Sequence, residues 1–565
     1  MRILGLSVFC DASAALIENN RIICAVEEER LNRIKHYEGF PWLAIDECLD
    51  VANLTINDID IIAVGWNPYI GWPNRIAASL KSLMNSYKLF LLKMKRGTSY
   101  LDRCKELFSI RSVLSRKYCK EIKQKIFFIN HHLSHAASAF LLSPWQEVNA
   151  IVADGIGESA TISFYHCVGN VITRTKTIKF PHSLGHVYAS VTKFLGFRMC
   201  YDEGKVMALA SFGRNTYADL FSALIEINEK KGDIKVGNVI LDYHAARHGL
   251  FSERWLKLTE LTPRQNGEPL THKHKDLACS LQRRIEEAVL SLLKSNIVSP
   301  NTPLCAAGGL FLNVVLNGRV LREFNHNYFV QPAAGDNGVS IGSALYVASR
   351  QLSSFKKSKL SHIYFGRNYT DQQTIKCLKN APNRYYLSNN IYAETAEFIA
   401  QGKIVGWYQG GMEFGSRALG NRSILANPLK SDMTEIINSK VKHREPFRPF
   451  AGSVILEEGH KYFEHFQESP YMLKVFYFRK RFRNKFTAIT HVDHSCRVQT
   501  VSRTNKVYYA LLQEIRKRLG FGVVLNTSLN VKGEPIVNTP EEALLLLNNT
   551  SLDVLIIGNF VVQKL

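Results

Sequence analysis

Two segments of the chain repeat one pattern of strands and turns, and this repeat limits the folds that the chain can adopt. The first segment reads as apolar strands over residues 3–7, 13–18 and 21–26, with a turn at Asp11. The second, about 145 residues later, reads as strands over 150–153 and 160–166 around a turn at Asp154–Gly157, with a further strand after Gly169. The repeat predicts an α/β domain duplicated in the manner of the actin/hexokinase type of ATPase, in which each half supplies one phosphate-facing hairpin.

A chain of 565 residues is too long for one compact core. The polar, basic segment Ser349–Lys359 reads as a domain edge, and new α/β material follows it. We expect two domains, over residues 1–355 and 356–565. In the second we expect helices over 392–400 and 433–441 and strands over 403–408 and 523–526.

Composition narrows the class of protein. No run of 18 apolar residues is present, the first residues lack the features of a signal peptide, and the eleven cysteines form no CxxC pair. These features favour a cytoplasmic protein without a membrane partner. The net charge of +22 would attract polyanions or phosphorylated small molecules, and a merely basic surface explains it equally well. Basic residues cluster over 88–125 and 479–485, but no zinc finger or RNP signature accompanies them, so a nucleic-acid partner is not expected.

Four side chains form a candidate metal site. His131 and His135 are spaced to share one helical face, although the pair alone fits a polar helix start capped by Asn130. Asp154 follows a strand in a glycine turn, and Asp336 lies in a second turn of that kind. Two imidazoles and two carboxylates suit Fe, Mn or Zn. In a duplicated ATPase fold these turns would meet at the cleft.

Other turns are candidates for binding phosphates. The pair Gly308-Gly309, followed by Asn313, would let backbone amides approach a phosphate or ribose, although a plain tight turn is the commoner explanation of such a pair. Lys205 lies beside a glycine, an arrangement that is common both at phosphates and in surface turns. In the second half, basic side chains stand on loops stiffened by glycine and proline, and the loop 525–530 adds hydroxyls. Arginine forks on rigid loops suit a small phosphorylated substrate. These cations include Arg417, Lys442, Arg448 and Arg497.

The chain resembles, from end to end, the O-carbamoyltransferases that modify nodulation factors, aminoglycosides, ansamycins, cephalosporins and related natural products. The resemblance is carried by many ordered motifs: residues 11–16, 27–30, 35–36, 131–140, 154–158, 181–185, 203–213, 308–313, 413–423, 444–450, 497–500 and 526–535.

The resemblance implies an N-terminal domain similar to the threonylcarbamoyl-transfer domain of tRNA-modifying enzymes and a YrdC-like C-terminal domain. It implies the use of ATP and carbamoyl phosphate, formation of carbamoyl-adenylate, and transfer of the carbamoyl group to a small-molecule alcohol. Iron(II) or another divalent metal, with Mg as a further candidate, would be bound by His131, His135, Asp154 and Asp336. The resemblance assigns the nucleotide and transfer site to Lys35, Gly308, Gly309 and Asn313, and carbamoyl phosphate to Arg417, Arg448, Arg497, Ser528 and Lys442.

The sequence departs from the pattern of that family at three positions. Cys10 precedes Asp11 where the family usually has histidine, Gly411 replaces an arginine, and Ser416 replaces a proline. Histidine would be the natural base for an acceptor hydroxyl, whereas the ordinary pKa of cysteine is about two units higher. Asp11 or another histidine can take the role, the acceptor can be a better nucleophile, or activity is reduced. The catalytic candidates are Cys10, Asp11 and Lys35.

Two other functions stay open from the sequence: an RNA-modifying enzyme of the same fold, and a degenerate member that only binds. We expect residues 70–125 and 215–275 to face the acceptor, whose identity the sequence does not reveal. A homodimer is the ordinary expectation for the assembly.

Overall fold

The computed structural model describes residues 1–71, 104–324 and 327–565, which form two compact units. The first unit consists of residues 1–23 and 36–359, and the second of residues 24–35 and 360–565. The polar, basic composition near residue 355 indicates a change of domain there, whereas nothing in the sequence indicated that residues 24–35 belong to the second unit.

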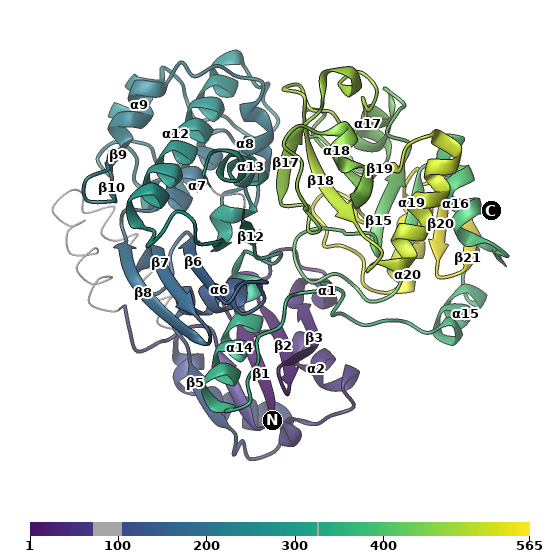
Figure 1. The fold of residues 1–565 in the computed structure, drawn as a ribbon, viewed down its shortest axis with the longest axis horizontal. Coiled ribbons are helices and arrows are strands. Elements are labelled where there is room, and N and C mark those ends of the chain that lie inside the picture. The colour runs from purple at the N-terminus through teal and green to yellow at the C-terminus, as the bar shows by residue number, and fades with distance from the viewer. Residues whose placement is uncertain (72–103, 325–326) are drawn as a thin grey trace. The chain divides into compact units, whose positions relative to one another are not determined.

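The first unit is built on two five-stranded sheets of one plan, although the last residues of one edge strand, 24–27, are grouped with the second unit (Figure 1). Their strand orders are β3-β2-β1-β4-β5 and β8-β7-β6-β11-β12. The central strand, β1 or β6, pairs antiparallel with the strand that follows it in the chain, β2 or β7. It pairs parallel with β4 or β11, which in turn pairs parallel with β5 or β12. The strands of the first sheet are Arg2–Ser7, Ser13–Glu18, Arg21–Glu27, Ile61–Val64 and Lys125–Phe128; β6–β8, β11 and β12 are Glu147–Ala153, Ala160–Val168, Val171–Lys179, Leu304–Ala307 and Tyr328–Val330. The predicted duplicated fold is confirmed.

One helix follows the last strand of each sheet, and these two helices pack together. α6 (His131–Phe140) follows β5, and α14 (Val339–Gln351) follows β12. They approach so closely that a Cβ atom on Gly342 would lie 1.9 Å from the Ser134 carbonyl oxygen. Gly5 of β1 has a similar relation to Ser340 of α14, at 2.0 Å. Small residues therefore set the spacing between the two halves.

The remaining helices of the first unit connect and cover the two sheets. They are α2 (Trp42–Val51), α5 (Ile110–Tyr118), α7 (Leu184–Phe194), α8 (Glu203–Ala210), α9 (Ala218–Leu224), α10 (Tyr243–Arg247), α11 (Glu253–Thr259), α12 (His272–Asn296) and α13 (Val314–Glu323). A two-stranded ribbon, β9 (Ile225–Asn228) and β10 (Asp233–Val236), lies in the long crossover between β8 and β11. Short 3-10 turns cover Ile56–Asp58, Gly309–Leu312 and Asp336–Gly338.

The second unit is built on one mixed nine-stranded sheet in the order β13-β21-β20-β14-β15-β19-β16-β18-β17. Its strands β13–β21 are Arg384–Leu387, Val405–Tyr408, Arg422–Ala426, Ala451–Ile455, Lys474–Tyr477, Ser495–Val501, Val523–Ser528, Val554–Ile557 and Phe560–Gln563. Its helices are α1 (Glu28–Asn32), α15 (Asp371–Lys379), α16 (Ile391–Ala400), α17 (Met433–Ile436), α18 (Gly459–Tyr462), α19 (Lys506–Leu519) and α20 (Pro540–Asn549). A π-helical turn covers Ile437–Val441, and 3-10 turns cover Leu456–Glu458 and Lys480–Phe482.

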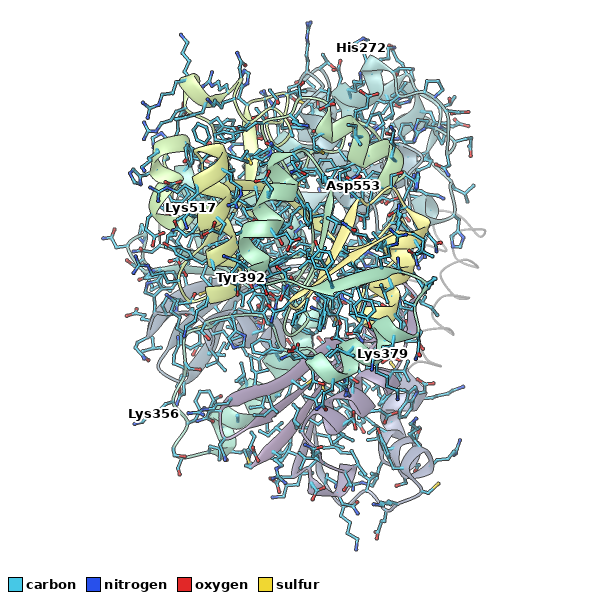
Figure 2. The ribbon with its side chains drawn as sticks, turned by 90° about the vertical axis from the view of Figure 1, so that its right-hand side faces the viewer. His272, Lys356, Lys379, Tyr392, Lys517 and Asp553 are labelled. Atoms are coloured by element: carbon cyan, nitrogen blue, oxygen red, sulfur yellow. The ribbon has the colours of Figure 1, made fainter. Side chains whose placement is uncertain are left out.

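α16 and α19 pack side by side on this sheet, and their apolar faces form its core. Trp407, Leu425 and Val524 from the strands are buried against Ile399 and Leu512 from the helices. The outer faces are polar, as at Lys517 of α19, which is labelled in Figure 2 together with Tyr392 of α16. Each helix buries one apolar stripe against β-branched and aromatic side chains of the sheet, and this burial explains why α16 and α19 form a layer on it.

The expected strands and helices form, with some boundary differences. The region 433–441 is helical, with a π turn in its second half, and α14 continues to Gln351, into the segment expected to be a domain edge. No helix among the described residues is long and apolar enough to cross a membrane.

Candidate metal centre and anion site

The four predicted metal ligands come together in the first unit. His131 and His135 stand on the first turns of α6, Asp154 follows β6, and Asp336 begins the 3-10 turn before α14. His131 Nε2 lies 3.1 Å from Asp154 Oδ2 and 3.4 Å from Asp336 Oδ1, while His135 Nε2 lies 3.5 Å and 3.6 Å from the same two atoms. The two Nε2 atoms are 3.2 Å apart. One donor atom of each residue therefore faces a common point.

This spacing fits a divalent ion. Ligands bonded at 2.0–2.2 Å to one ion in tetrahedral or octahedral geometry lie about 3.0–3.6 Å apart. The five separations between these donor atoms, from 3.1 to 3.6 Å, fall in that range. Two imidazole nitrogens with two carboxylate oxygens suit Fe, Mn or Zn better than Mg, which prefers oxygen donors. Mg is thus the least suited of the expected metals.

Two residues fix the first turn of α6 and with it the direction of His131. Asn130 Oδ1 caps the helix by accepting from Leu133 N at 3.2 Å. Glu158, which is buried, accepts from His131 N at 2.9 Å and from Asn130 Nδ2 at 2.8 Å. His131 Nδ1 lies 3.3 Å from the Gly65 carbonyl oxygen, which favours the tautomer with its lone pair on Nε2.

The opposite charges of the imidazoles and carboxylates in the cluster stabilise one another. Burial would lower the pKa of His131, but the carboxylates of Asp336 and Asp154 outweigh it and raise this pKa well above its ordinary value. Burial would likewise raise the pKa of Asp154, but the bonds from His131 and His135 hold it well below its ordinary value. Mutual attraction of this strength is what a preformed cation site provides.

The glycine turn after β11 lies against the Asp154 turn. Gly308 has φ +97°, and a Cβ atom on it would lie 2.3 Å from the Ala153 carbonyl oxygen. A Cβ atom on Gly309 would lie 3.2 Å from Asp154 Oδ1. The absence of side chains here lets the backbone of the predicted nucleotide turn reach the edge of the metal cluster.

Two other predicted nucleotide-binding residues have partners within the first unit. Lys205, on α8, pairs with Asp202 Oδ1 at 2.9 Å. Asn313 Oδ1 caps α13 by accepting from Leu316 N at 3.0 Å, and it also accepts from Gln282 Nε2 at 3.2 Å. Asn313 Nδ2 in turn donates to Gln282 Oε1 at 2.8 Å. These bonds give both residues structural roles, and contact with a nucleotide stays a prediction for them.

The turn between β1 and β2 carries Cys10 and Asp11. Asp11 Oδ1 lies 2.7 Å from His36 Nδ1. Cys10 is exposed as a residue, yet its thiol is crowded by the fold; this desolvation, together with the negative charges of Asp336, Glu38 and Asp11, raises the pKa of Cys10 well above its ordinary value. The Cys10 thiol is therefore protonated at neutral pH and is not itself a proton acceptor.

Arginines gather in the second unit. Burial and the charges of Arg497 and Arg448 lower the pKa of Arg417 well below its ordinary value, and burial with Arg448 lowers that of Arg497 to about 10. Arg444 has its pKa lowered by burial and by the same two neighbours. The buried Nη2 of Arg444 and Nε of Arg497 have no hydrogen-bond partner within the described residues. Crowded cations with unused donors form a site for an anion.

Lys442 and Ser528 form a network beside this cluster. Lys442 Nζ bonds to Asn530 Oδ1 at 2.7 Å and to the carbonyl oxygens of Ser528 and Asn530, and Ser528 Oγ donates to Asn530 Oδ1 at 2.7 Å. Burial, then Arg444, Lys35 and Arg448, lower the pKa of Lys442 well below its ordinary value. Lys442 thus fixes the loop that presents Ser528, and Lys35 lies within electrostatic range of it.

The excursion of residues 24–35 supports the loop that carries Arg417. Arg30 Nη2 donates to the Gly415 carbonyl oxygen at 2.7 Å, and Gly415 N donates to Glu27 Oε1 at 2.6 Å. Glu413 Oε1, from the same loop, accepts from the backbone nitrogens of Leu419, Asn421 and Arg422. Two buried carboxylates and one buried guanidinium therefore hold this loop in place.

Comparison with known proteins identifies the chain's relatives. The family model described as the carbamoyltransferase N-terminus matches residues 2–345, and that described as the carbamoyltransferase C-terminus matches residues 396–564. The chain belongs to the carbamoyltransferase family. It is 35% identical to nodulation protein NolNO of Sinorhizobium fredii, over 98% of this chain and 79% of that protein. It is 27% identical to 3'-hydroxymethylcephem-O-carbamoyltransferase of Amycolatopsis lactamdurans, over 98% of both chains.

The carbamoyltransferase assignment confirms the family inferred from the motifs and the chain's nature as an enzyme. Among solved structures, component A of (R)-2-hydroxyglutaryl-CoA dehydratase from Acidaminococcus fermentans is 14% identical, over 62% of this chain and all of that chain, with a TM-score of 0.34.

The departures from the carbamoyltransferase pattern have local structural correlates. A Cβ atom on Gly411 would lie 2.8 Å from the Gly366 carbonyl oxygen and 3.0 Å from that of Tyr364, so this carbamoyltransferase has no space there for an arginine without a backbone shift. Ser416 is exposed in the loop beside Arg417. Of the expected acceptor-facing stretch 70–125 and the basic cluster 88–125, residues 72–103 lie outside the described residues.

Three supporting residues of this carbamoyltransferase were not singled out from the sequence. They are Glu158 at the start of α6, His36 beside Asp11, and Arg444 in the arginine cluster. Each belongs to one of the motifs that carry the family resemblance, so the sequence could have pointed to it. Their roles depend on contacts between distant segments, which spacing does not reveal.

Proposed function

We propose that this carbamoyltransferase uses ATP to convert carbamoyl phosphate to carbamoyl-adenylate and transfers the carbamoyl group to a hydroxyl of a small-molecule natural product. Carbamate is a poor electrophile, and the mixed anhydride with AMP gives it a good leaving group. The relative named as a cephem O-carbamoyltransferase supports an alcohol as the acceptor.

The arginine cluster carries this proposal. Burial and neighbouring arginines, Arg448 among them, lower the pKa values of Arg417, Arg444 and Arg497. Arg444 and Arg497 each present a buried donor that has no acceptor among the described residues. A dianionic phosphate group would relieve the repulsion and accept those donors, and Ser528 would add a hydroxyl. Lys442 contributes by holding the Ser528 loop, because its ammonium group is engaged by Asn530 and backbone carbonyls.

The first unit supplies the groups for the phosphates of a nucleotide. His131, His135, Asp154 and Asp336 would hold a divalent ion, which when bound supplies positive charge to offset that of phosphate oxygens. The Gly308-Gly309 backbone borders this cluster and offers amide donors at a point where no side chain intervenes. Glu158 and Asn130 keep the imidazole of His131 aimed at the ion site.

The test is carbamoyl phosphate-dependent turnover of ATP. Purified protein supplied with Fe(II), ATP and carbamoyl phosphate should release pyrophosphate, and AMP should follow when an acceptor from a panel of sugar and aliphatic alcohols is added. Omission of carbamoyl phosphate should abolish both releases. Failure to release pyrophosphate under any of these conditions would refute the proposed reaction.

A net charge of +22 supports a second candidate, an RNA-directed carbamoyl-transfer enzyme of the same fold. It requires tRNA binding that weakens steeply with salt and loss of a modified nucleoside when the protein is deleted. Micromolar or weaker tRNA binding at physiological salt would contradict it. A degenerate, non-catalytic protein is the third candidate; a large gain in turnover on Cys10→His would favour it over a base placed elsewhere.

A further inference from the structure

We propose that His36, oriented by Asp11, is the general base that takes the proton of the acceptor hydroxyl in this chain. The inference rests on the proposed function, since it concerns the second half of that reaction. Cys10 is poorly suited to act as this base, because the ordinary pKa of a thiol lies above neutrality. The inference assigns the role to a different segment of the chain.

The contact between the two side chains has the geometry of a carboxylate–imidazole pair. Asp11 Oδ1 lies 2.7 Å from His36 Nδ1, and the side chains are 30% and 31% exposed. A carboxylate can only accept, so this bond places a hydrogen on Nδ1 and the lone pair of the neutral ring on Nε2. The pair is thus oriented for proton acceptance at Nε2 and is accessible to a solute.

Backbone pairing fixes the two segments against each other. Phe9 and Gly39 exchange backbone hydrogen bonds of 3.2 and 2.9 Å, and Ala12 N donates to the Tyr37 carbonyl oxygen at 3.2 Å. The turn that carries Asp11 and the segment that begins with His36 therefore form one bridged structure. The short side-chain contact is a consequence of that bridge rather than of two mobile surface groups.

Aromatic packing holds the imidazole ring. The ring of Tyr201 meets that of His36 edge to face, with centroids 4.7 Å apart, and the Arg198 guanidinium lies 3.5 Å above the Tyr201 ring. A side chain that is clamped by an aromatic ring and a carboxylate loses little further entropy when it meets a substrate.

Strained backbone marks the same place. Phe9, Asp11 and His36 have φ values of +84°, +43° and +53°, a region that residues other than glycine rarely adopt. Such a conformation persists only where the surrounding structure enforces it. Three such residues in one bridged pair of segments indicate that the fold enforces the positions of Asp11 and His36.

The pair also lies beside the metal cluster. Asp11 Oδ2 is 3.7 Å from the position of a Cβ atom on Gly335, which immediately precedes Asp336. An acceptor hydroxyl held at His36 would thus approach a carbamoyl-adenylate bound at the glycine turn and the ion site. The arrangement gives His36 access to the reacting atoms that a distant surface histidine lacks.

The transfer step balances with His36 as the base. The acceptor oxygen forms a bond to the carbamoyl carbon, and its proton passes to His36 Nε2. The bond from that carbon to the phosphate oxygen breaks, and its electron pair leaves with AMP. The products are a carbamate ester, AMP and an imidazolium, stabilised by Asp11, that later returns its proton to solvent.

The experiment separates the two half-reactions in the full-length protein. His36→Gln and Asp11→Asn are compared with the unaltered protein for the single-turnover burst of pyrophosphate, and for AMP release to hydroxyl nucleophiles (water and the best alcohol of the panel). AMP release to hydroxylamine, which attacks without a general base, is measured in parallel. His166→Gln is the matched control, since His166 pairs with Glu147 at 2.9 Å on β7, away from the site.

We expect His36→Gln to keep the pyrophosphate burst and to lower kcat for hydroxyl nucleophiles about 10²–10⁴-fold, while hydroxylamine transfer changes less than about threefold. Asp11→Asn should give a smaller loss of the same kind, and His166→Gln should change neither the pyrophosphate burst nor the transfer rates. Equal losses with hydroxylamine and alcohols, or hydroxyl transfer unaffected by His36→Gln, would overturn the inference. Absence of the burst in the unaltered protein would instead refute the proposed function.

Discussion

At the scale of single residues, Lys442 and Arg444 are neighbouring cations with different hydrogen-bond partners. Lys442 lies beside the arginine cluster, yet its ammonium bonds to Asn530 Oδ1 and to two carbonyl oxygens. Arg444 uses Nε to bond Asn438 Oδ1 at 2.7 Å and stacks over Phe450, which leaves the buried Nη2 facing no acceptor in the described part of the chain. The sequence places both on one loop; their different hydrogen bonds come from the tertiary fold.

Replacement of Arg444 tests this distinction. Arg444→Ala removes one charge-assisted bond to phosphate, so the KM for carbamoyl phosphate should rise roughly 10–100-fold, with little change in the KM for ATP. Steady-state pyrophosphate release at varied carbamoyl phosphate measures it. Arg481→Ala, at an exposed arginine of the same unit, is the control and should leave both constants unchanged. An unaltered KM for carbamoyl phosphate in Arg444→Ala would contradict the role.

Glu203 gives a prediction of pH dependence. Burial raises the pKa of Glu203 to about 7 from 4.5, so the ionised form is disfavoured in the folded state. Below pH 4.5 both states carry the proton and no cost arises; the cost grows as pH rises through the two values and is full above 7. Glu203→Gln should therefore stabilise the first unit by about 1–3 kcal/mol at pH 8 and little at pH 4.5.

The measurement is the difference in Tm between Glu203→Gln and the unaltered protein across that pH range. Glu226→Gln provides the control, because Glu226 is exposed and pairs with Lys235 on the β9–β10 ribbon. A Tm difference for Glu203→Gln that does not change with pH would show that the Glu203 carboxyl titrates normally.

At the scale of elements, apolar runs located most of the strands and helices, because burial on both faces of a central strand leaves little freedom of composition. The α6–α14 contact was harder to predict, because it depends on small residues that have no distinctive pattern in the sequence. The convergence of His131, His135, Asp154 and Asp336 could be anticipated, because these residues stand at strand ends and helix starts. The Glu158 anchor could not be anticipated, since its three bonds reach residues 67, 130 and 131.

The close approach of α6 and α14 can be tested with one methyl group. A Cβ atom on Gly342 would meet the Ser134 carbonyl oxygen at 1.9 Å, so Gly342→Ala should push the helices apart and destabilise the first unit by about 3 kcal/mol. Because His131 and His135 lie on α6 and Asp336 precedes α14, Co(II) or Fe(II) binding should weaken as well.

Gly204→Ala is the matched control for that experiment. Gly204 lies in α8 with no atom within 4 Å of its Cβ position, so alanine should stabilise the protein by up to about 1 kcal/mol and leave metal binding unchanged. Chemical denaturation and metal titration report the two effects. Equal behaviour of the two alanine variants would show that the helix contact tolerates expansion.

At the scale of the whole molecule, two units divide the expected chemistry, and one short segment crosses between them in the chain. The sequence indicated the change near residue 355 through polar, basic composition. Residues 24–35 carry no such mark, because their strand-like start continues directly into the acidic run before Arg30. Their place in the second unit depends on buried bonds from Glu27 and Arg30 to Gly415.

Removal of Arg30 should therefore affect the unit to which it belongs. Arg30 and Glu27 have side chains that are 3% and 4% exposed, so Arg30→Ala leaves a buried carboxylate without its charge partner. We expect the second unit to lose about 3–5 kcal/mol and carbamoyl phosphate to bind more weakly, while metal binding by the first unit is retained. Calorimetry with and without carbamoyl phosphate, and metal titration, measure these effects. Arg21→Ala, at an exposed arginine of β3, should change none of them.

The repeated strand plan of the first unit also has a geometric consequence. Two halves with one strand order have equivalent turns, so the turn after the first strand of one half has a counterpart in the other. The counterpart of the β6–β7 turn, with Asp154, is the β1–β2 turn, with Asp11. The same turn thus supplies a carboxylate in each half. The two acids differ in their neighbours, which are imidazoles of α6 for Asp154 and His36 for Asp11.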